Sequence, residues 1–401
     1  MRLLVMHPNF PAQFLYLAHY LRQMPDNQVV FITANEENSM QNVHKVLFKP
    51  AREPSPDTHH YLTSMEEAVL QGQAVADLAF QLKAQGFRPD VIIGHSGWGC
   101  TMYMKDVFPD VPLVCYFEWF YRAHGSDCDF GGAVVTAEAE TRIRMKNAPI
   151  LIDLYSCDRG ISPTYWQHSQ FPAEYATKIK VIHDGVDTGF CRPQPGAKLV
   201  LPDKNLDLSQ VDEIVTYVGR GFEPYRGFPQ FMAAIRILLK RRPHCHVVIV
   251  GEDRVCYGSK LKDGKTYKEA MLEELPDLDT ARVHFTGYLP KDQYMQVLQA
   301  SKVHVYLTMP FVLSWSMLEA MACGCCIVAS NTQPVMEVIN DGVNGLLADF
   351  FSPGQIAGRI EEALSHRRWR EGIGSRARET ILDRYDVRRT LPRYLEWLFN
   401  K

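Results

Sequence analysis

The chain has 401 residues, of which 46% are hydrophobic and 22% are charged, and it carries a formal net charge of −3. This length predicts two globular domains, each able to bury a sizeable core. The slightly acidic balance argues against a nucleic-acid-binding protein that relies on bulk positive charge. No apolar run approaches the roughly 20 residues of a membrane span, no small-residue cleavage site follows Met1 to Met6, and the ten scattered cysteines suit a reducing compartment. We therefore expect a cytoplasmic protein.

Apolar strands alternate with helical stretches through the first half of the chain. We expect strands at residues 3–6, 29–33, 91–94 and 113–117, and helices at residues 14–23 and 65–85. Such alternation is typical of a parallel sheet covered by helices. Residues 190–212, rich in Pro, Lys, Asp and Gln, form the clearest linker, and a strand at 214–218 restarts the pattern. Beyond residue 357 the chain is expected to be helical to its end.

The strand at residues 214–218 ends in Gly219 and Arg220, and Arg226 follows shortly after. In open α/β sheets, ligands bind beyond the carboxyl ends of the strands, and a glycine there lets a ligand approach the backbone. Two guanidinium groups at such a place suit a diphosphate, which they hold by charged and often bidentate hydrogen bonds. Each arginine by itself is more often a solvated surface charge.

Residues 311–330 combine a turn, a short helix that opens on serines, a glycine stop and a buried strand. A helix N-terminus presents unpaired backbone N–H groups and the positive end of the helix dipole. A phosphate placed before Ser314 to Met317 would therefore be held without many cationic side chains. Glu319 has two readings: it can accept hydrogen bonds from a ribose, or it can form a capping box with Ser316 and bind nothing.

These motifs occur in a recognisable order along the carboxyl half: Gly219-Arg220, Arg226-Gly227, Val250-Gly251, Phe285 to Leu289, Leu318 to Gly324 and Asp341 to Gly345. The order resembles the nucleotide-sugar domain of retaining glycosyltransferases of family 4. The amino half agrees more loosely, through Leu3 to Gln13 and His183 to Asp187.

The resemblance implies an α/β protein of GT-B architecture, with two Rossmann-like domains that face a central cleft. Residues 1–190 would form the acceptor-side domain and residues 191–380 the nucleotide-sugar-binding domain. Residues 381–401 would form a terminal helix that crosses back to pack on the first domain.

The resemblance also implies a function. The chain would be a retaining hexosyltransferase of glycan biosynthesis that moves a sugar from a UDP- or GDP-type nucleoside diphosphate to a hydroxyl acceptor, which is a saccharide, a lipid-linked compound or a small molecule. No cofactor, metal ion or nucleic acid is expected, whereas peripheral membrane contact is allowed and the oligomeric state is left open. Asp127 with Asp129 and Asp277 with Asp279 match the Asp-x-Asp metal motif of GT-A enzymes, but we expect both pairs to be surface turns.

The predicted site residues fall into three groups. The catalytic group is Arg220, Arg226, Glu118 and His95. The two arginines hold the diphosphate as negative charge builds on it, and Glu118 and His95 lie at strand ends. The donor-binding group is Gly219, Leu289, Phe311, Leu313, Ser314, Trp315, Met317, Leu318 and Glu319. The acceptor-side group is Asn9, Phe10, Trp98 and Tyr121, the last from an aromatic run that can stack on a sugar face or pack in the core.

Two departures from the family pattern bear on function. Phe311 stands where the family commonly has the first glutamate of a Glu-x7-Glu pair, and Glu118 stands where many members have histidine. A second hypothesis is therefore a catalytically weak GT-B protein that serves as a nucleotide-sugar sensor or partner subunit. A nicotinamide dehydrogenase is disfavoured because no Gly-x-Gly-x-x-Gly follows the first strand, where the chain reads His7-Pro-Asn-Phe-Pro.

Overall fold

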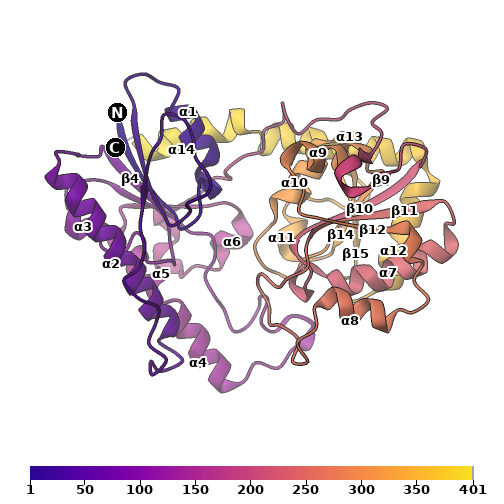
Figure 1. Cartoon of the computed structure of the whole chain (residues 1–401), viewed down its shortest axis with the longest axis horizontal. Coiled ribbons are helices and arrows are strands. Elements are labelled where there is room, and N and C mark those ends of the chain that lie inside the picture. The colour runs from indigo at the N-terminus through magenta and orange to yellow at the C-terminus, as the bar shows by residue number, and fades with distance from the viewer. Residues whose placement is uncertain (400–401) are drawn as a thin grey trace. The chain divides into compact units, whose positions relative to one another are not determined.

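The computed structural model describes residues 1–399 and divides them into two compact units (Figure 1). The first unit contains residues 1–185 and the chain from Val387 onward, and the second contains Val186–Asp386. The sequence placed the first boundary at 190/191 and the second at 380/381. The segment after residue 185 is held in the second unit by a bridge between Val186 and Asp386 and by a hydrogen bond from Thr188 Oγ1 to Asp386 Oδ2.

The first unit is a seven-stranded parallel sheet in the order β3-β2-β1-β4-β5-β6-β7. The strand bounds are Arg2–Met6 (β1), Gln28–Thr33 (β2), His44–Leu47 (β3), Val91–His95 (β4), Leu113–Tyr116 (β5), Arg159–Ser162 (β6) and Ile179–Val181 (β7). Its helices are Leu15–Leu21 (α1), Thr63–Ala84 (α2), Met104–Val107 (α3), Ala137–Lys146 (α4), Ala148–Ser156 (α5), Tyr165–Ser169 (α6) and Val387–Phe399 (α14). The strand order reverses between β1 and β4, and in open α/β sheets this is where ligands bind.

The terminal helix α14 belongs to the first unit (Figure 1). It packs on α1, and its Tyr394 and Leu398 are buried in the same core cluster as the apolar side chains of β1. The Arg159 guanidinium on β6 also donates to the backbone carbonyls of Trp397 and Leu398. Apolar burial and these charged hydrogen bonds together anchor the end of the chain.

The second unit repeats this plan with a six-stranded parallel sheet in the order β12-β11-β10-β13-β14-β15. The strand bounds are Glu213–Gly221 (β10), Cys245–Glu252 (β11), Val283–Gly287 (β12), Val303–Tyr306 (β13), Cys326–Ser330 (β14) and Leu346–Ala348 (β15), with a small ladder of Val200–Leu201 (β8) and Leu206–Asp207 (β9). The helices are Phe228–Arg241 (α7), Tyr267–Glu274 (α8), Lys291–Ala300 (α9), Trp315–Ala322 (α10), Gln333–Met336 (α11), Pro353–Ser365 (α12) and Arg367–Arg384 (α13). The order reverses between β10 and β13.

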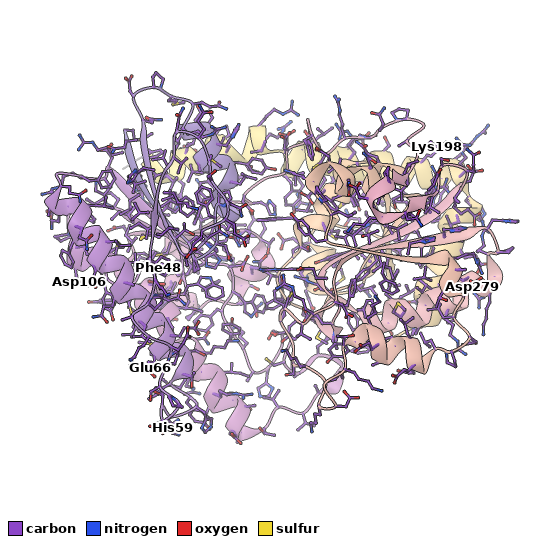
Figure 2. All side chains as sticks on the ribbon, viewed as in Figure 1. Phe48, His59, Glu66, Asp106, Lys198 and Asp279 are labelled. Carbon is purple, nitrogen blue, oxygen red and sulfur yellow. The ribbon has the colours of Figure 1, made fainter. Side chains whose placement is uncertain are left out.

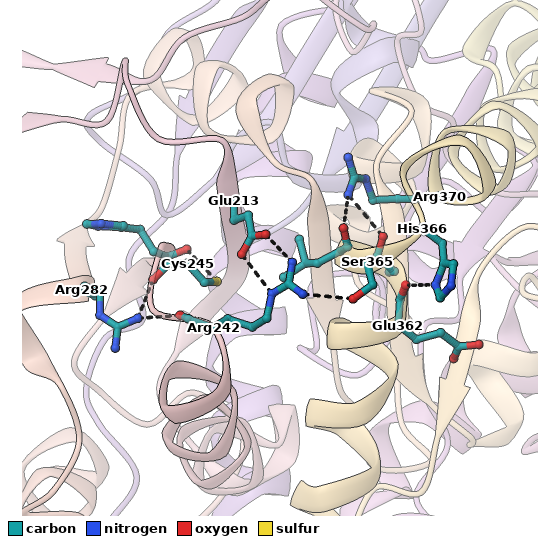
Figure 3. A network of polar contacts seen from close by, with 11 residues as sticks. Glu213, Arg242, Cys245, Arg282, Glu362, Ser365, His366 and Arg370 are labelled. Atoms are coloured by element: carbon teal, nitrogen blue, oxygen red, sulfur yellow. Dashed lines mark hydrogen bonds and ion pairs between the residues drawn. The ribbon is translucent and has the colours of Figure 1, made fainter.

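A network of charged side chains secures the amino-terminal end of this second sheet (Figure 3). Arg242, just after α7, donates to the carboxylate of Glu213 at the start of β10 and to Ser365 Oγ at the end of α12. Arg282 donates to the carbonyls of Arg242 and Cys245. The network is built from partners inside the protein and lies at the opposite end of β10 from Arg220, so its role is structural.

No helix within residues 1–399 is both long enough and apolar enough to span a membrane.

Candidate functional site

The two predicted arginines lie at the carboxyl end of β10 in different environments. Arg220 is exposed and makes no hydrogen bond or ion pair with the part of the chain that the structure describes. Arg226, the last residue of the short 3-10 helix Pro224–Arg226 (η5), is only 6% exposed. Its Nη1 donates to Tyr306 Oη at 3.0 Å, Thr308 Oγ1 at 2.8 Å and the Val312 carbonyl at 2.9 Å.

Aromatic rings enclose the Arg226 guanidinium. Its Cζ lies 5.1 Å from the ring centroid of Tyr257, and 6.0 Å from those of Tyr306 and Phe311. No carboxylate among residues 1–399 forms an ion pair with it. A buried charge is costly unless a charge of opposite sign accompanies it. The surroundings of Arg226 therefore favour a bound anion.

The N-terminus of α10 reaches the same place. Ser314 is the N-cap residue, and its Oγ accepts from the backbone N–H of Ser316 at 3.3 Å. The Ser314 N–H donates to Tyr306 Oη at 2.9 Å, so one hydroxyl accepts from both Arg226 and the start of the helix. The positive end of the helix dipole and the guanidinium charge thus act on the same small region.

Glu319 does not cap its own helix. The N-cap is Ser314 rather than Ser316, and a carboxylate oxygen of Glu319 accepts from Tyr294 Oη at 2.7 Å. The capping-box interpretation is therefore wrong. Burial raises the pKa of Glu319 above its ordinary value, while the Tyr294 hydrogen bond and the charge of Lys291 oppose that rise.

The other predicted donor residues divide by burial. Phe311 is 8% exposed and packs edge-on against Tyr225 and Tyr257, with ring centroids 5.3 and 5.4 Å away. Met317 and Leu318 are fully buried in the core beneath α10, so only their backbone can reach a ligand. Leu289 and Leu313 are also buried, Gly219 and Ser314 are half-buried, and Trp315 is exposed.

In the first unit, His95 and Glu118 lie together at the carboxyl ends of β4 and β5. His95 Nδ1–H donates to the Ser96 carbonyl at 2.8 Å, and its buried Nε2 lies 3.5 Å from Glu118 Oε2. Gln13 Nε2 donates to Glu118 Oε1 at 2.8 Å. Since the proton of the neutral ring is on Nδ1, Nε2 is a hydrogen-bond acceptor. Two hydrogen-bond acceptors this close together suit a hydroxyl donor that bonds to both.

Buried side chains contact His95 and the loop that follows it. The ring of His7, the residue after β1, packs edge-on against His95 with centroids 4.9 Å apart. Asp153 on α5 is fully buried and accepts from Ser96 Oγ and Thr101 Oγ1, both at 2.8 Å. Burial raises the pKa of Asp153 to about 6, although these hydrogen bonds oppose the rise. Asp153 therefore fixes the loop that follows β4.

The predicted acceptor-side residues do not all face solvent. Asn9 is exposed, and Trp98 is exposed with its ring 6.4 Å from that of His95. Phe10 is instead a core residue that packs edge-on against Phe31 at 4.7 Å. Tyr121 is also half-buried against the core, with the Lys146 ammonium 3.9 Å from its ring centroid.

The carboxylates of the two Asp-x-Asp pairs have partners within the chain. Asp277 pairs with Arg236 at 2.6 Å and with Lys240. Asp279, at the edge of the second unit in Figure 2, pairs with Arg282 at 2.8 Å. Asp129 accepts from the backbone N–H groups of Gly125 and Ser126 in a turn. Within residues 1–399, no group of three or more His, Cys, Asp or Glu side chains is arranged to hold a metal ion.

Several residues near Arg226 and near the His95–Glu118 pair were not predicted from the sequence. His7 directly follows β1 and Tyr306 ends β13, so the rule that ligands bind at strand ends could have found them. Gln13 lies in the short 3-10 helix Ala12–Phe14 that precedes α1, and Tyr257 lies in a loop between β11 and α8. No local pattern marks either residue, because each reaches the site through packing between distant segments.

Residues 25–191 match a family model described as Glycosyl transferase family 4 group, and residues 203–380 match Glycosyl transferases group 1. A D-inositol 3-phosphate glycosyltransferase of Segniliparus rotundus is 26% identical over 212 residues, or 52% of this chain and 44% of the relative. The protein of the same name from Thermobifida fusca is 24% identical over 292 residues, or 70% of this chain and 62% of the relative. The chain thus spans less than two thirds of the length of these relatives.

Solved structures share the fold over nearly the whole chain. Anabaena HepE in complex with UDP and glucose superposes with a TM-score of 0.74 at 18% identity and covers 100% of both chains. Sucrose-phosphate synthase from Thermosynechococcus elongatus gives a TM-score of 0.72 at 18% identity, covering 100% of this chain and 99% of the other. These likenesses and the two strand orders confirm the predicted α/β fold class with GT-B architecture.

Proposed function

The chain belongs to glycosyltransferase family 4, and on that basis we propose that it is a retaining hexosyltransferase that uses a UDP- or GDP-sugar and a hydroxyl acceptor and needs no metal ion. Its relatives carry glycosyltransferase names, and a protein of the same fold has been solved with UDP and glucose. The proposal rests chiefly on Arg226, which is 6% exposed and has no carboxylate partner among residues 1–399. A diphosphate supplies the negative charge that this place favours.

The proposed chemistry is cleavage of the bond between the anomeric carbon and the diphosphate oxygen. Negative charge grows on the leaving phosphate, and Arg226, the exposed Arg220 and the N-terminus of α10 stabilise it. The acceptor oxygen bonds to the anomeric carbon on the face that the phosphate leaves, and a phosphate oxygen takes the acceptor proton. No protein nucleophile is needed, because the electrostatic contribution acts on the transition state.

The first unit would supply the acceptor-side groups. Glu118 Oε2 and His95 Nε2, 3.5 Å apart, can together accept a hydrogen bond from one hydroxyl and so orient its oxygen. Gln13 holds Glu118, and the exposed Trp98 offers an aromatic face to an acceptor ring. These features suit a saccharide or another polyhydroxyl acceptor.

A second candidate, a nucleotide-sugar-binding protein with weak or no transfer, is favoured by one observation. Phe311 occupies the place of the usual first glutamate, and its ring is packed against Tyr225 and Tyr257, so no carboxylate is present there to bind the donor sugar.

Donor hydrolysis separates the two candidates. The protein is incubated with UDP-glucose, UDP-N-acetylglucosamine or GDP-mannose without acceptor, and nucleoside diphosphate release is followed by NMR. Slow release of nucleotide, with a free sugar of unchanged anomeric configuration at first appearance, supports the retaining enzyme. Tight binding of a nucleotide sugar that stays intact, with or without a panel of hydroxyl acceptors, supports the sensor instead.

A further inference from the structure

Glu223 is fully buried, and its carboxylate accepts hydrogen bonds from a row of backbone N–H groups. Its Oε1 accepts from Cys256 at 3.0 Å, and its Oε2 accepts from Tyr257 at 2.9 Å and Gly258 at 2.7 Å. No lysine or arginine of the described residues forms an ion pair with it. Consecutive N–H groups that converge in this way make an anion-binding concavity. Here the chain's own carboxylate fills it and fixes the loop.

The loop is also fitted closely against the end of β10. Gly251 has φ +144°, and a Cβ there would lie 2.1 Å from the carbonyl oxygen of Gly219. A Cβ on Gly258 would meet Glu223 Oε2 and the Tyr225 ring at 3.3 Å each. Glycine at both positions lets residues 251–258 approach the strand end and the carboxylate. The path of the loop is therefore set by backbone contacts as well as by Glu223.

This loop carries Tyr257 over the candidate anion site. The Tyr257 ring centroid lies 5.1 Å from Arg226 Cζ and 5.4 Å from the Phe311 ring centroid. An aromatic face over a guanidinium is attractive, and more so when the cation is shielded from water. A charge in a region from which water is excluded also interacts more strongly with a bound phosphate.

We propose that Glu223 is a positioning residue of the donor site and that it acts through Tyr257, whose ring confines Arg226 for the diphosphate of a nucleotide sugar. The inference rests on the proposed function. Loss of the Glu223 carboxylate releases the loop, withdraws the ring from Arg226 and exposes the guanidinium to water. Donor affinity falls, although neither residue needs to touch the sugar.

The test uses the full chain and UDP and GDP as probes in titration calorimetry. Glu223→Gln leaves one oxygen where two accept hydrogen bonds now, and Tyr257→Ala removes the ring. We expect each variant to weaken binding of the preferred nucleotide about tenfold. Tyr257→Phe keeps the ring, so it should weaken binding less than Tyr257→Ala does. Because Glu223 acts through Tyr257, the double variant Glu223→Gln/Tyr257→Ala should bind no more weakly than Tyr257→Ala alone.

Glu269→Gln is the matched control, because the exposed Glu269 also holds a backbone N–H group, that of Thr266, but at the start of α8. It should leave nucleotide affinity unchanged. Trypsin provides a readout that needs no ligand: cleavage after the exposed Lys260, Lys262 and Lys265 should be faster in Glu223→Gln than in the wild type.

Additive losses in the double variant, or unchanged nucleotide binding in Glu223→Gln and Tyr257→Ala, would overturn the positioning role while leaving the proposed function intact. Failure of the wild-type protein to bind either nucleotide would overturn the proposed function and this inference with it.

Discussion

Replacement of Arg226 by alanine should reduce nucleotide binding about 100-fold. The guanidinium is 6% exposed, has no carboxylate partner among residues 1–399 and lies beside the N-terminus of α10. Loss of one buried, charged partner of a diphosphate costs about 3 kcal/mol, which is about two orders of magnitude in Kd. Arg226→Lys should recover part of the loss, since it restores the charge without the planar fork.

The assay is thermal unfolding with and without UDP or GDP. At a nucleotide concentration of about 100 times the wild-type Kd, binding adds about 2.7 kcal/mol of stability. The same concentration only equals the Kd of a variant weakened about 100-fold, so it adds about 0.4 kcal/mol. For a domain of about 200 residues the shift in Tm should fall from roughly 5–11 °C to about 1 °C.

Each variant is compared with its own nucleotide-free Tm, because Arg226→Ala also removes the hydrogen bonds to Tyr306, Thr308 and Val312 and lowers stability by itself. Arg236→Ala is the control: this arginine is in the same unit, its side chain is 42% exposed, and it pairs with Asp277. A full nucleotide-induced shift in Arg226→Ala would refute the assignment of the anion site.

Other perturbations test separate parts of the structure. Phe311→Glu should change the ratio of rates on two donor sugars, relative to the uncharged control Phe311→Gln, by a factor that corresponds to roughly 1–3 kcal/mol of activation free energy. A large fall in Tm with an unchanged ratio would make Phe311 a core residue only. Glu118→Gln should lower kcat on the order of 100-fold with nucleotide Kd unchanged, and equal kcat would remove Glu118 from the reaction. Activity should survive excess EDTA; complete loss restored by Mn²⁺ or Mg²⁺ would contradict the metal-free mechanism. The pKa of Asp153 rises from 3.8 to about 6 on folding. Its contribution to the free energy of unfolding is therefore greatest below pH 3.8 and is lost as the pH rises through 6. Between pH 3.8 and 6 the free energy of unfolding of the wild type should therefore fall by up to about 3 kcal/mol through this residue, and Asp153→Asn should lack that fall. If urea unfolding shows the same pH dependence in both proteins, Asp153 does not cause it.

The sequence by itself determined several of the strands and the strand ends where polar groups gather. Hydrophobic periodicity and composition are local properties of the chain, so the strand expected at 91–94 appears as Val91–His95 and the helix expected at 65–85 appears as Thr63–Ala84. The strand-end rule then drew attention to His95, Glu118 and Arg226 before any contact was known. Motif order was sufficient for the family and the fold.

Only the tertiary structure decided the environment of these residues. Burial and pairing depend on segments far apart in sequence, and nothing near Arg226 in the chain indicates that Tyr257 and Phe311 enclose it or that no carboxylate pairs with it. The same reason explains why Phe10, next to a strand end, lies in the core instead of facing an acceptor. A strand end fixes where a backbone stops, whereas the free energy of a side chain there is set by the neighbours that folding brings to it.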